Sequence, residues 1–384
     1  RMPNGTTGTS AEDIRNAAMD IGFPVLIRPS YVLGGRGMEI LSNEQQLNAY
    51  LEEAYLAPDK PLLVDDYLGH ATEIDVDAAC DGTDVLVGAI MEHLEEAGIH
   101  SGDSTCFIPA QNISESMLAK IAEQTKIIGL GLKIKGCYNI QFALQGDDLY
   151  VLEVNPRSSR TVPFVAKATG LPMARIAANI TIGIPLSEQD IPRRTSGQIC
   201  VKAPVFPFIK LRGLDPAPGP EMKSTGEVYG SDVTADKAYL KARLATEVPV
   251  ATSGGAYLTV RNEDKEGLIP IAQELVELGF NLFATPGTCD ALRDAGVPVS
   301  VAYRIADKNH PDALDLMHKG EVSFIVNVPT VSGGAVRDGN MMRRLAVELN
   351  IPFVTTLRGA KMEVAASKAH LSGPLEPRRL TVHY

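Results

Sequence analysis

The chain has 384 residues, of which 45% are hydrophobic and 22% are charged, and its formal net charge is -11 at pH 7. This length is enough for about two or three domains with substantial cores. The acidic balance and the lack of a basic run disfavour a nucleic-acid-binding surface. The N-terminus is polar and no apolar run approaches a membrane span, so we expect a cytoplasmic protein. The cysteines number five and show no C-x-x-C spacing, which indicates free thiols in a reducing compartment.

The first pattern in the chain is a pair of short strands joined by a glycine-rich turn. Residues 23–30 are apolar and include Arg28, the turn contains Gly34 and Gly35, and a second strand begins at Met38. Paired glycines let backbone N–H groups approach an anion and adopt positive φ. Most such turns are ordinary, so this turn indicates an anion site only in combination with the segments that follow.

Polar segments follow the turn at intervals along the chain. Residues 64–68 are acidic, residues 73–78 alternate between acidic and apolar side chains, and residues 98–104 form a polar loop punctuated by glycine. The alternation predicts a strand. His100 lies in the loop, and a histidine alone in a loop is usually a surface residue. It gains significance only as one member of this set.

A hairpin is predicted where residues 138–144 and 149–155 alternate on either side of a polar turn. Glu153 and Asn155 are two residues apart and share a strand face, whereas Leu152 and Val154 are expected to point into a core. Pairing of Gln141 with Glu153 or Val151 would place Gln141 on the face of Glu153. A slip of one residue would reverse this.

The end of this hairpin has the side chains of a metal-assisted phosphoryl-transfer site. A carboxylate beside amide oxygens is a hard ligand set suited to Mg2+. Arg157 and Arg160 follow directly and could offset the charge of a transferring phosphoryl group. The alternative is an edge strand with a solvated glutamate and an arginine salt bridge.

The last third of the chain has a different pattern. Residues 246–255 gather Pro, Gly, Ser and Thr and indicate a domain break, and residues 231–244 before them indicate a helix with a Ser or Asp cap. Strand-like and helix-like runs then alternate, which predicts a parallel sheet with helices on both faces and ligands at its carboxyl edge. The strands are expected at 256–260, 281–284, 297–301, 322–328 and 352–355, and the helices at 264–278, 288–295, 311–319, 339–349 and 360–369.

One loop of this region has the character of a phosphate site. Thr285 ends a predicted strand and Thr288 opens a helix, and a helix N-terminus with two hydroxyl groups suits a phosphate. The alternative is an ordinary capped loop between a strand and a helix.

Together these motifs resemble the ATP-grasp family, and within it the large subunits of carbamoyl phosphate synthetases. The similar strings are RPSYVLGGRGMEI, MEHLEEAGIHSGDS, NIQFAL, LEVNPRSSRTVPFVAKATG and GPEMKSTGEV. The resemblance covers nearly the whole chain, and TVPF is similar to the second, carbamate-phosphorylating half of those subunits. It implies a mixed α/β and α+β protein. ATP-grasp lobes would occupy residues 1–245, and a Rossmann-like, methylglyoxal-synthase-like allosteric domain would occupy residues 254–384.

The resemblance also implies a reaction and the residues that perform it. The reaction is MgATP-dependent phosphorylation of carbamate to carbamoyl phosphate, which feeds pyrimidine and arginine biosynthesis. Mg2+ or Mn2+ would be held by Gln141, Glu153 and Asn155, and Arg157 and Arg160 would face the transferred group. The implied ATP contacts are Arg28, Gly34, Gly35, Asp66, Leu68, Glu73, Gly98, Ile99, His100, Ser101, Gln141 and Glu153.

Regulation by a nucleotide effector is implied for the C-terminal domain. Arg304 stands where a lysine is familiar in the family, and the loop 327–334 is longer than in the familiar version. Relatives regulated by ornithine have an acid where this chain has Ala203, so ornithine control is not expected. The implied effector contacts are Lys265, Thr285, Thr288, Arg304 and Asn327.

The implied partner is the glutaminase small subunit of the parent complex. A homo-oligomer, with a second copy of the chain as partner, is also possible. Only about two dozen residues precede the first ATP-grasp strand, so the resemblance leads us to expect a chain without the lobe that precedes this strand in the family. Exposed phosphates would then weaken electrostatic stabilisation, and we expect the isolated chain to bind nucleotide without efficient turnover. The alternatives are another ATP-grasp carboxylate ligase and a non-catalytic nucleotide-binding regulatory fragment.

Overall fold

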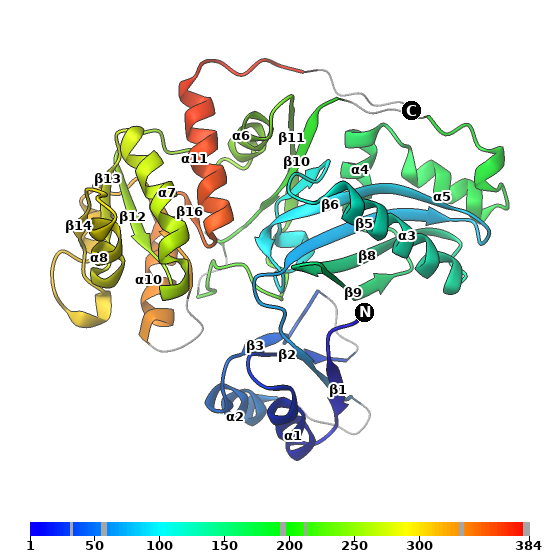
Figure 1. Ribbon diagram of the computed structural model, residues 1–384, viewed down its shortest axis with the longest axis horizontal. Helices are drawn as coiled ribbons and strands as arrows, with labels where there is room; N and C mark the ends of the chain where they lie inside the picture. The colour runs from blue at the N-terminus through cyan, green and yellow to red at the C-terminus, as the bar shows by residue number, and fades with distance from the viewer. Residues whose placement is uncertain (31–33, 55–59, 193–196, 211–212, 330–333, 379–384) are drawn as a thin grey trace.

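Three sheets make up the framework of the molecule in a computed structural model (Figure 1). The structure describes residues 1–384 except 31–33, 55–59, 193–196, 211–212, 330–333 and 379–384. The first two sheets are antiparallel and the third is parallel. Within the described residues, no helix combines the length and the apolar composition that crossing a membrane requires.

The N-terminal lobe is a small antiparallel sheet covered by two helices (Figure 1). Its strand order is β1-β4-β2-β3, and its core contains Ile14, Val25, Ile27 and Leu47. The predicted strand pair around the glycine-rich turn is confirmed as β2 and β3. The elements are β1 (Gly5–Gly8), α1 (Ala11–Ile21), β2 (Val25–Pro29), β3 (Glu39–Leu41), α2 (Glu44–Glu53) and β4 (Leu62–Asp66).

The second sheet has seven antiparallel strands in the order β11-β10-β7-β6-β5-β8-β9. Its strands are β5 (Thr72–Cys80), β6 (Val85–Glu96), β7 (Cys106–Ile108), β8 (Gly136–Gln145), β9 (Asp148–Asn155), β10 (Ile199–Val205) and β11 (Gly226–Asp232). The helices α3 (Glu115–Gly131), α4 (Val162–Thr169) and α5 (Met173–Thr181) pack beside it, and α6 (Ala235–Ala245) follows β11.

The register of the β8–β9 hairpin decides which side chains face the N-terminal lobe. Gln141 pairs with Glu153, as predicted, but Phe142 pairs with Val151, so a bulge leaves Leu152 without a partner. A bulge interrupts the strict alternation of faces. The prediction that Leu152 and Val154 share a core is therefore wrong. Val154 packs in the core under the sheet, whereas Leu152 packs beside Leu68 and lines a cavity.

The helix predicted at 231–244 begins later than expected. Ser231 and Asp232 are the last residues of β11, and α6 has Thr234 as its N-cap residue. Asp232 forms ion pairs with Lys241 at 2.7 Å and Arg378 at 3.0 Å. The carboxylate therefore neutralises distant cations instead of capping a helix, so the predicted start is wrong.

The third sheet is parallel, with strand order β14-β13-β12-β15-β16, and confirms the predicted alternation of strands and helices. The outer strands are shorter than predicted, because Val297 belongs to the turn after α8 and donates its N–H to Leu292. The strands are β12 (Gly255–Thr259), β13 (Asn281–Ala284), β14 (Ser300–Val301), β15 (Phe324–Asn327) and β16 (Phe353–Val354). The helices are α7 (Lys265–Glu277), α8 (Pro286–Asp294), α9 (Ala313–His318), α10 (Gly334–Glu348) and α11 (Leu357–Leu371).

Helix α11 joins the parallel-sheet region to the seven-stranded sheet, as Figure 1 shows by its position between α7 and α6. Ala366 and Ala369 share an apolar cluster with Phe107 and Tyr239. The Tyr239 hydroxyl donates to Glu363 at 2.9 Å, and Arg243 pairs with the same carboxylate. Burial of this charged network between α6 and α11 fixes the two helices against each other.

Candidate functional site

A cavity of about 530 Å³ lies between the N-terminal lobe and one face of the seven-stranded sheet. Its walls come from segments that are far apart in the sequence, including β2, β4, β5, β8 and β9. The structure brings together all the residues predicted to contact nucleotide, metal and phosphoryl group: Arg28, Gly34, Gly35, Asp66, Leu68, Glu73, Gly98, Ile99, His100, Ser101, Gln141, Glu153, Asn155, Arg157 and Arg160.

Of the three predicted metal ligands, Gln141 lies in the middle of β8, and Glu153 and Asn155 lie at the end of β9. Gln141 is directly opposite Glu153 across the hairpin, and Asn155 follows two residues later. The Gln141 amide nitrogen donates to the Ser101 hydroxyl at 2.8 Å, which leaves the amide oxygen to accept a cation. Arg157 donates to the side-chain oxygen of Asn155 at 3.1 Å. Carboxylate and amide oxygens in this arrangement fit a hard divalent cation.

Below these ligands the sheet buries two carboxylates beside a histidine. Glu73, Asp75 and His93 have exposed fractions of 3%, 1% and 0%. The His93 ring nitrogens lie 3.9 Å from Glu73 and 3.4 Å from Asp75. Burial raises the pKa of Glu73 to about 7. Burial opposes charge on His93, but Cys106 and Asp75 outweigh it and raise the His93 pKa well above its ordinary value.

The strand register extends this polar row across the sheet. His93 on β6 pairs with Cys106 on β7, which pairs in turn with Lys202 on β10. Lys202 is fully buried and donates to the Ser101 carbonyl at 3.0 Å. Asp75 and Lys202 line the cavity, but the sequence analysis missed them both as well as His93. A signal was present for Lys202, which interrupts an otherwise apolar strand, yet its face depends on pairings between distant strands.

The glycine-rich turn approaches the cavity from the N-terminal lobe. Gly34 and Gly35 have φ of +66° and +70°, as the sequence led us to expect. A Cβ at Gly35 would lie 2.0 Å from the Pro220 carbonyl oxygen. Glycine is therefore required at position 35 by close contact with another backbone segment as well as by its φ. Residues 31–33 of the predicted turn lie outside the described residues.

A second pocket, of about 90 Å³, lies at the carboxyl edge of the parallel sheet. The Thr285 hydroxyl donates to Thr288 at 3.2 Å at the start of α8. The pocket is lined by every residue predicted to contact an effector, namely Lys265, Thr285, Thr288, Arg304 and Asn327. The part of the predicted long loop at 330–333 lies outside the described residues.

Ala203, the residue that stands in place of an acid, is buried in the apolar cluster with Leu94, Phe107 and Tyr239. Nothing at Ala203 itself provides a charge for a cationic amino acid. The absence of a carboxylate there is consistent with the expectation that ornithine does not act on this chain, which stays a prediction.

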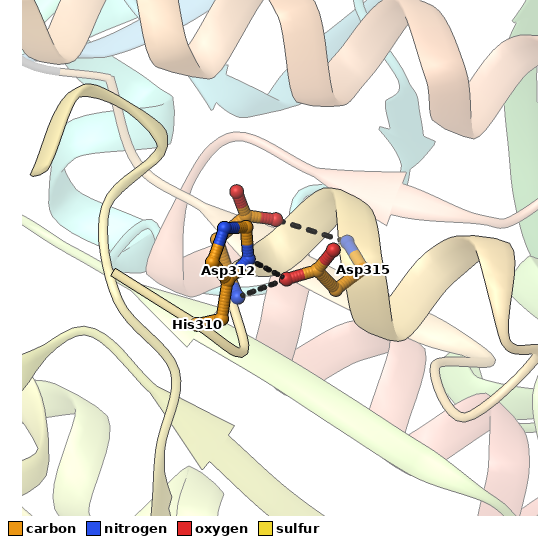
Figure 2. A group of neighbouring side chains, drawn as sticks. All are labelled: His310, Asp312 and Asp315. Atoms are coloured by element: carbon orange, nitrogen blue, oxygen red, sulfur yellow. Dashed lines mark hydrogen bonds and ion pairs between the residues drawn. The ribbon is translucent and has the colours of Figure 1, made fainter. Parts of the chain in front are cut away.

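His310, Asp312 and Asp315 form a compact group at the start of α9 (Figure 2). Asp312 and Asp315 cap the helix reciprocally, since each side chain accepts from the backbone N–H of the other. His310 pairs with Asp315 at 2.5 Å, and this contact raises the pKa of the exposed histidine. The capping hydrogen bonds account for the group as a helix start.

The seven-stranded sheet, the small lobe and the nucleotide-sized cavity between them define an ATP-grasp fold. Solved structures share this fold at low sequence identity. An ADP complex of N5-carboxyaminoimidazole ribonucleotide synthetase is similar with a TM-score of 0.52 and 14% identity, over 64% of this chain and 66% of that one. A biotin carboxylase from Campylobacter jejuni gives a TM-score of 0.50 and 17% identity, over 64% and 62%.

The family is shown by sequence comparison. Residues 1–189 match the family model "Carbamoyl-phosphate synthase L chain, ATP binding domain", and residues 267–355 match "MGS-like domain". A carbamoyl phosphate synthase large chain from Methanosarcina barkeri is 46% identical over 97% of this chain and 94% of its own length. The chain belongs to the carbamoyl phosphate synthase large chain family.

Other relatives are much longer than this chain. The large chain from Methanosarcina acetivorans is 47% identical over 97% of this chain but only 35% of its own length. The large chain from Methanothermobacter thermautotrophicus is 45% identical over 98% of this chain and 36% of its own length. The chain therefore spans about a third of the length of these relatives.

Proposed function

We propose that this chain binds MgATP in the large cavity and phosphorylates carbamate to carbamoyl phosphate as part of a carbamoyl phosphate synthetase. The observation that supports this best is the arrangement of Glu153, Gln141 and Asn155 with Arg157 and Arg160 along one wall of the cavity. Phosphoryl transfer depends mainly on positioning and on stabilisation of charge. Oxygen ligands beside two arginines supply both requirements.

In this proposal the nucleotide contacts both lobes. Arg28 forms a 2.5 Å ion pair with Asp65 in the N-terminal lobe, so the guanidinium is held in place at the cavity wall. Glu73 lies on the opposite sheet and would accept hydrogen bonds from nucleotide hydroxyl groups. Gln141, Glu153 and Asn155 would hold Mg2+ or Mn2+, which would offset the charge of the phosphates. The remaining ATP contacts would be the backbone and side chains of residues 98–101.

The second pocket is proposed as the site of a phosphorylated nucleotide effector. Lys265 and Arg304 supply positive charge, and Thr285 and Thr288 supply hydroxyl groups at a helix N-terminus. We propose residues 1–245 and 254–384 as the catalytic and regulatory domains. From the family we also propose that the protein binds a glutaminase subunit, associates with itself and is cytoplasmic. Its product would serve pyrimidine and arginine biosynthesis.

An assay that supplies carbamate and MgATP and measures ADP and carbamoyl phosphate together tests the proposed reaction. Bicarbonate and simple carboxylates serve as alternative acceptors for the rival ligase. For this chain alone we expect nucleotide binding with little turnover. The longer parent should be active, and Glu153→Gln should abolish its activity. The control is Asp148→Asn, at the other end of β9, where the carboxylate pairs with the exposed Arg1. Production of carbamoyl phosphate by the Glu153→Gln parent would contradict the assignment.

A further inference from the structure

Residues 213–224, between β10 and β11, connect the two candidate sites, and we call this segment the strap. One end lies at the nucleotide cavity. The Met222 N–H donates to the Gly34 carbonyl at 3.0 Å, and the His100 N–H donates to the Gly219 carbonyl at 2.8 Å. These bonds join the glycine-rich turn of the N-terminal lobe to the loop on the large sheet, with the strap between them.

A buried carboxylate anchors the same end of the strap. Asp103 is 1% exposed and accepts from the backbone N–H groups of Lys223 at 2.8 Å and Ser224 at 2.9 Å. The Lys223 ammonium group donates back to the carbonyls of Asp215 at 3.1 Å and Ala217 at 2.5 Å. The lysine therefore ties the two ends of the strap to each other, so a displacement at Asp215 is transmitted to Lys223.

The other end of the strap is bound to α10 by an arginine. Arg343 is 2% exposed and donates to both carboxylate oxygens of Asp215, at 2.9 and 2.6 Å. A two-bond contact between guanidinium and carboxylate is directional as well as strong. Burial opposes the charge of Asp215, but the hydrogen bonds from Arg343 outweigh burial and lower the pKa of this carboxyl group below its ordinary value.

The same guanidinium also contacts a residue of the effector pocket. Its third nitrogen donates to the side-chain oxygen of Asn327, and Asn327 lines the pocket. Gly339 lies against this contact, since a Cβ there would be 2.8 Å from the Arg343 nitrogen. One buried arginine thus contacts a pocket residue on one side and the strap on the other.

We propose that Arg343 is the positioning residue through which the effector pocket controls the nucleotide cavity. A ligand in the pocket that bonds to Asn327 draws this side chain and Arg343 with it, and weakens the pair of Arg343 with Asp215. The weakened pair loosens the strap from Gly34 and His100, and nucleotide affinity falls. This inference rests on the proposed function, which supplies the two ligands. The contacts between the two sites are observed among the described residues. Coupling between binding sites is reciprocal, so MgADP also weakens the effector.

The test is calorimetric titration of the full chain with MgADP, with and without saturating uridine monophosphate. In the wild type we expect the effector to weaken MgADP about fivefold or more. In Asp215→Asn and in Arg343→Lys this ratio should fall close to one while uridine monophosphate still binds. The matched control is Glu274→Gln, which removes one carboxylate from an exposed pair with Lys368 in the same region and should keep the wild-type ratio.

A second readout separates coupling from a general loss of stability. Amide hydrogen exchange at His100 and Met222 should accelerate when uridine monophosphate is added to the wild type, and should not respond in Asp215→Asn. If uridine monophosphate instead competed directly with MgADP in the nucleotide cavity, its effect on MgADP affinity would persist in Asp215→Asn. That result would overturn the proposal. So would a wild type that binds MgADP yet responds to neither uridine monophosphate nor phosphoribosyl pyrophosphate. A wild type that binds no MgADP would contradict the proposed function instead.

Discussion

The two candidate sites differ in how the chain builds them. The cavity of about 530 Å³ combines segments from two antiparallel sheets, and its lining runs from Pro3 to Pro220 in the sequence. The pocket of about 90 Å³ uses loops at the carboxyl ends of neighbouring parallel strands. Parallel strands bring their carboxyl ends together whenever strand and helix alternate. Antiparallel strands place side chains together only through a particular register.

The sites also differ in charge. The cavity contains buried Glu73 and Asp75 as well as Lys202 and several arginines, so it can hold a cation and phosphates together. The pocket is lined by Lys265 and Arg304 with Asp338 as its acid. This balance suits an anion without a metal. The difference favours a metal-nucleotide complex at the first site and a phosphorylated effector at the second.

The largest expected effect is at the metal ligands of the cavity. Glu153→Gln removes a formal charge from the cation site, and we expect Mg2+-dependent ADP affinity to fall about 100-fold. Calorimetry with MgADP, and with ADP in a chelator, measures it. Asp148→Asn on the same strand should leave the affinity unchanged. If the wild type and Glu153→Gln bound MgADP with equal affinity, the cavity would no longer be distinguished from the pocket as a metal-nucleotide site.

The next effect is a pH dependence confined to the cavity. Burial raises the pKa of Glu73 from 4.5 to about 7. Between these values the folded state keeps a proton that the unfolded state has lost, so the free energy of unfolding falls as pH rises. We expect Glu73 to lower the free energy of unfolding by up to about 3 kcal/mol between pH 5 and pH 8, as measured by urea unfolding. Glu73→Gln should remove it, whereas Glu277→Gln, on the exposed surface of α7, should not.

A third effect tests the contact between the glycine-rich turn and the strap. Gly35→Ala places a Cβ against the Pro220 carbonyl at a positive φ, and we expect a loss of about 2 kcal/mol in stability and weaker MgADP binding. Gly146→Ala has the same backbone strain, with φ of +58°, but no atom within 4 Å of the new Cβ. The difference between the two melting temperatures measures the contact alone. Equal shifts in melting temperature for the two variants would mean that the strap moves away from the new Cβ without a measurable loss of stability.

The smallest effect is expected at the effector pocket. Lys265→Gln removes one of its two cations, and we expect uridine monophosphate to bind about fivefold more weakly, equivalent to about 1 kcal/mol. Titration of the effector measures this. Lys319→Gln, at the end of α9 outside the pocket, is the control. MgADP affinity without effector should not change in either variant, and a change would mean that the two sites were wrongly separated.

The sequence by itself determined the β8–β9 hairpin and the order of strands and helices in the last third of the chain. The alternation of strands and helices beyond residue 255 predicted the parallel sheet, because each predicted unit is long enough to bury its own apolar face. The two alternating runs around a polar turn predicted the hairpin, with Glu153 or Val151 as possible partners of Gln141. These are local patterns, and local sequence fixes them.

Only the tertiary structure decided the rest, since it depends on pairings between distant segments. The bulge at Leu152 follows from how β8 and β9 fit against the core, and nothing in the alternation announces it. His93 and Lys202 lie in one row on either side of Cys106 because β6, β7 and β10 lie side by side. The contact of Arg343 with Asp215 spans 128 residues. Charged side chains can be buried at such places only when a partner is supplied by another part of the chain.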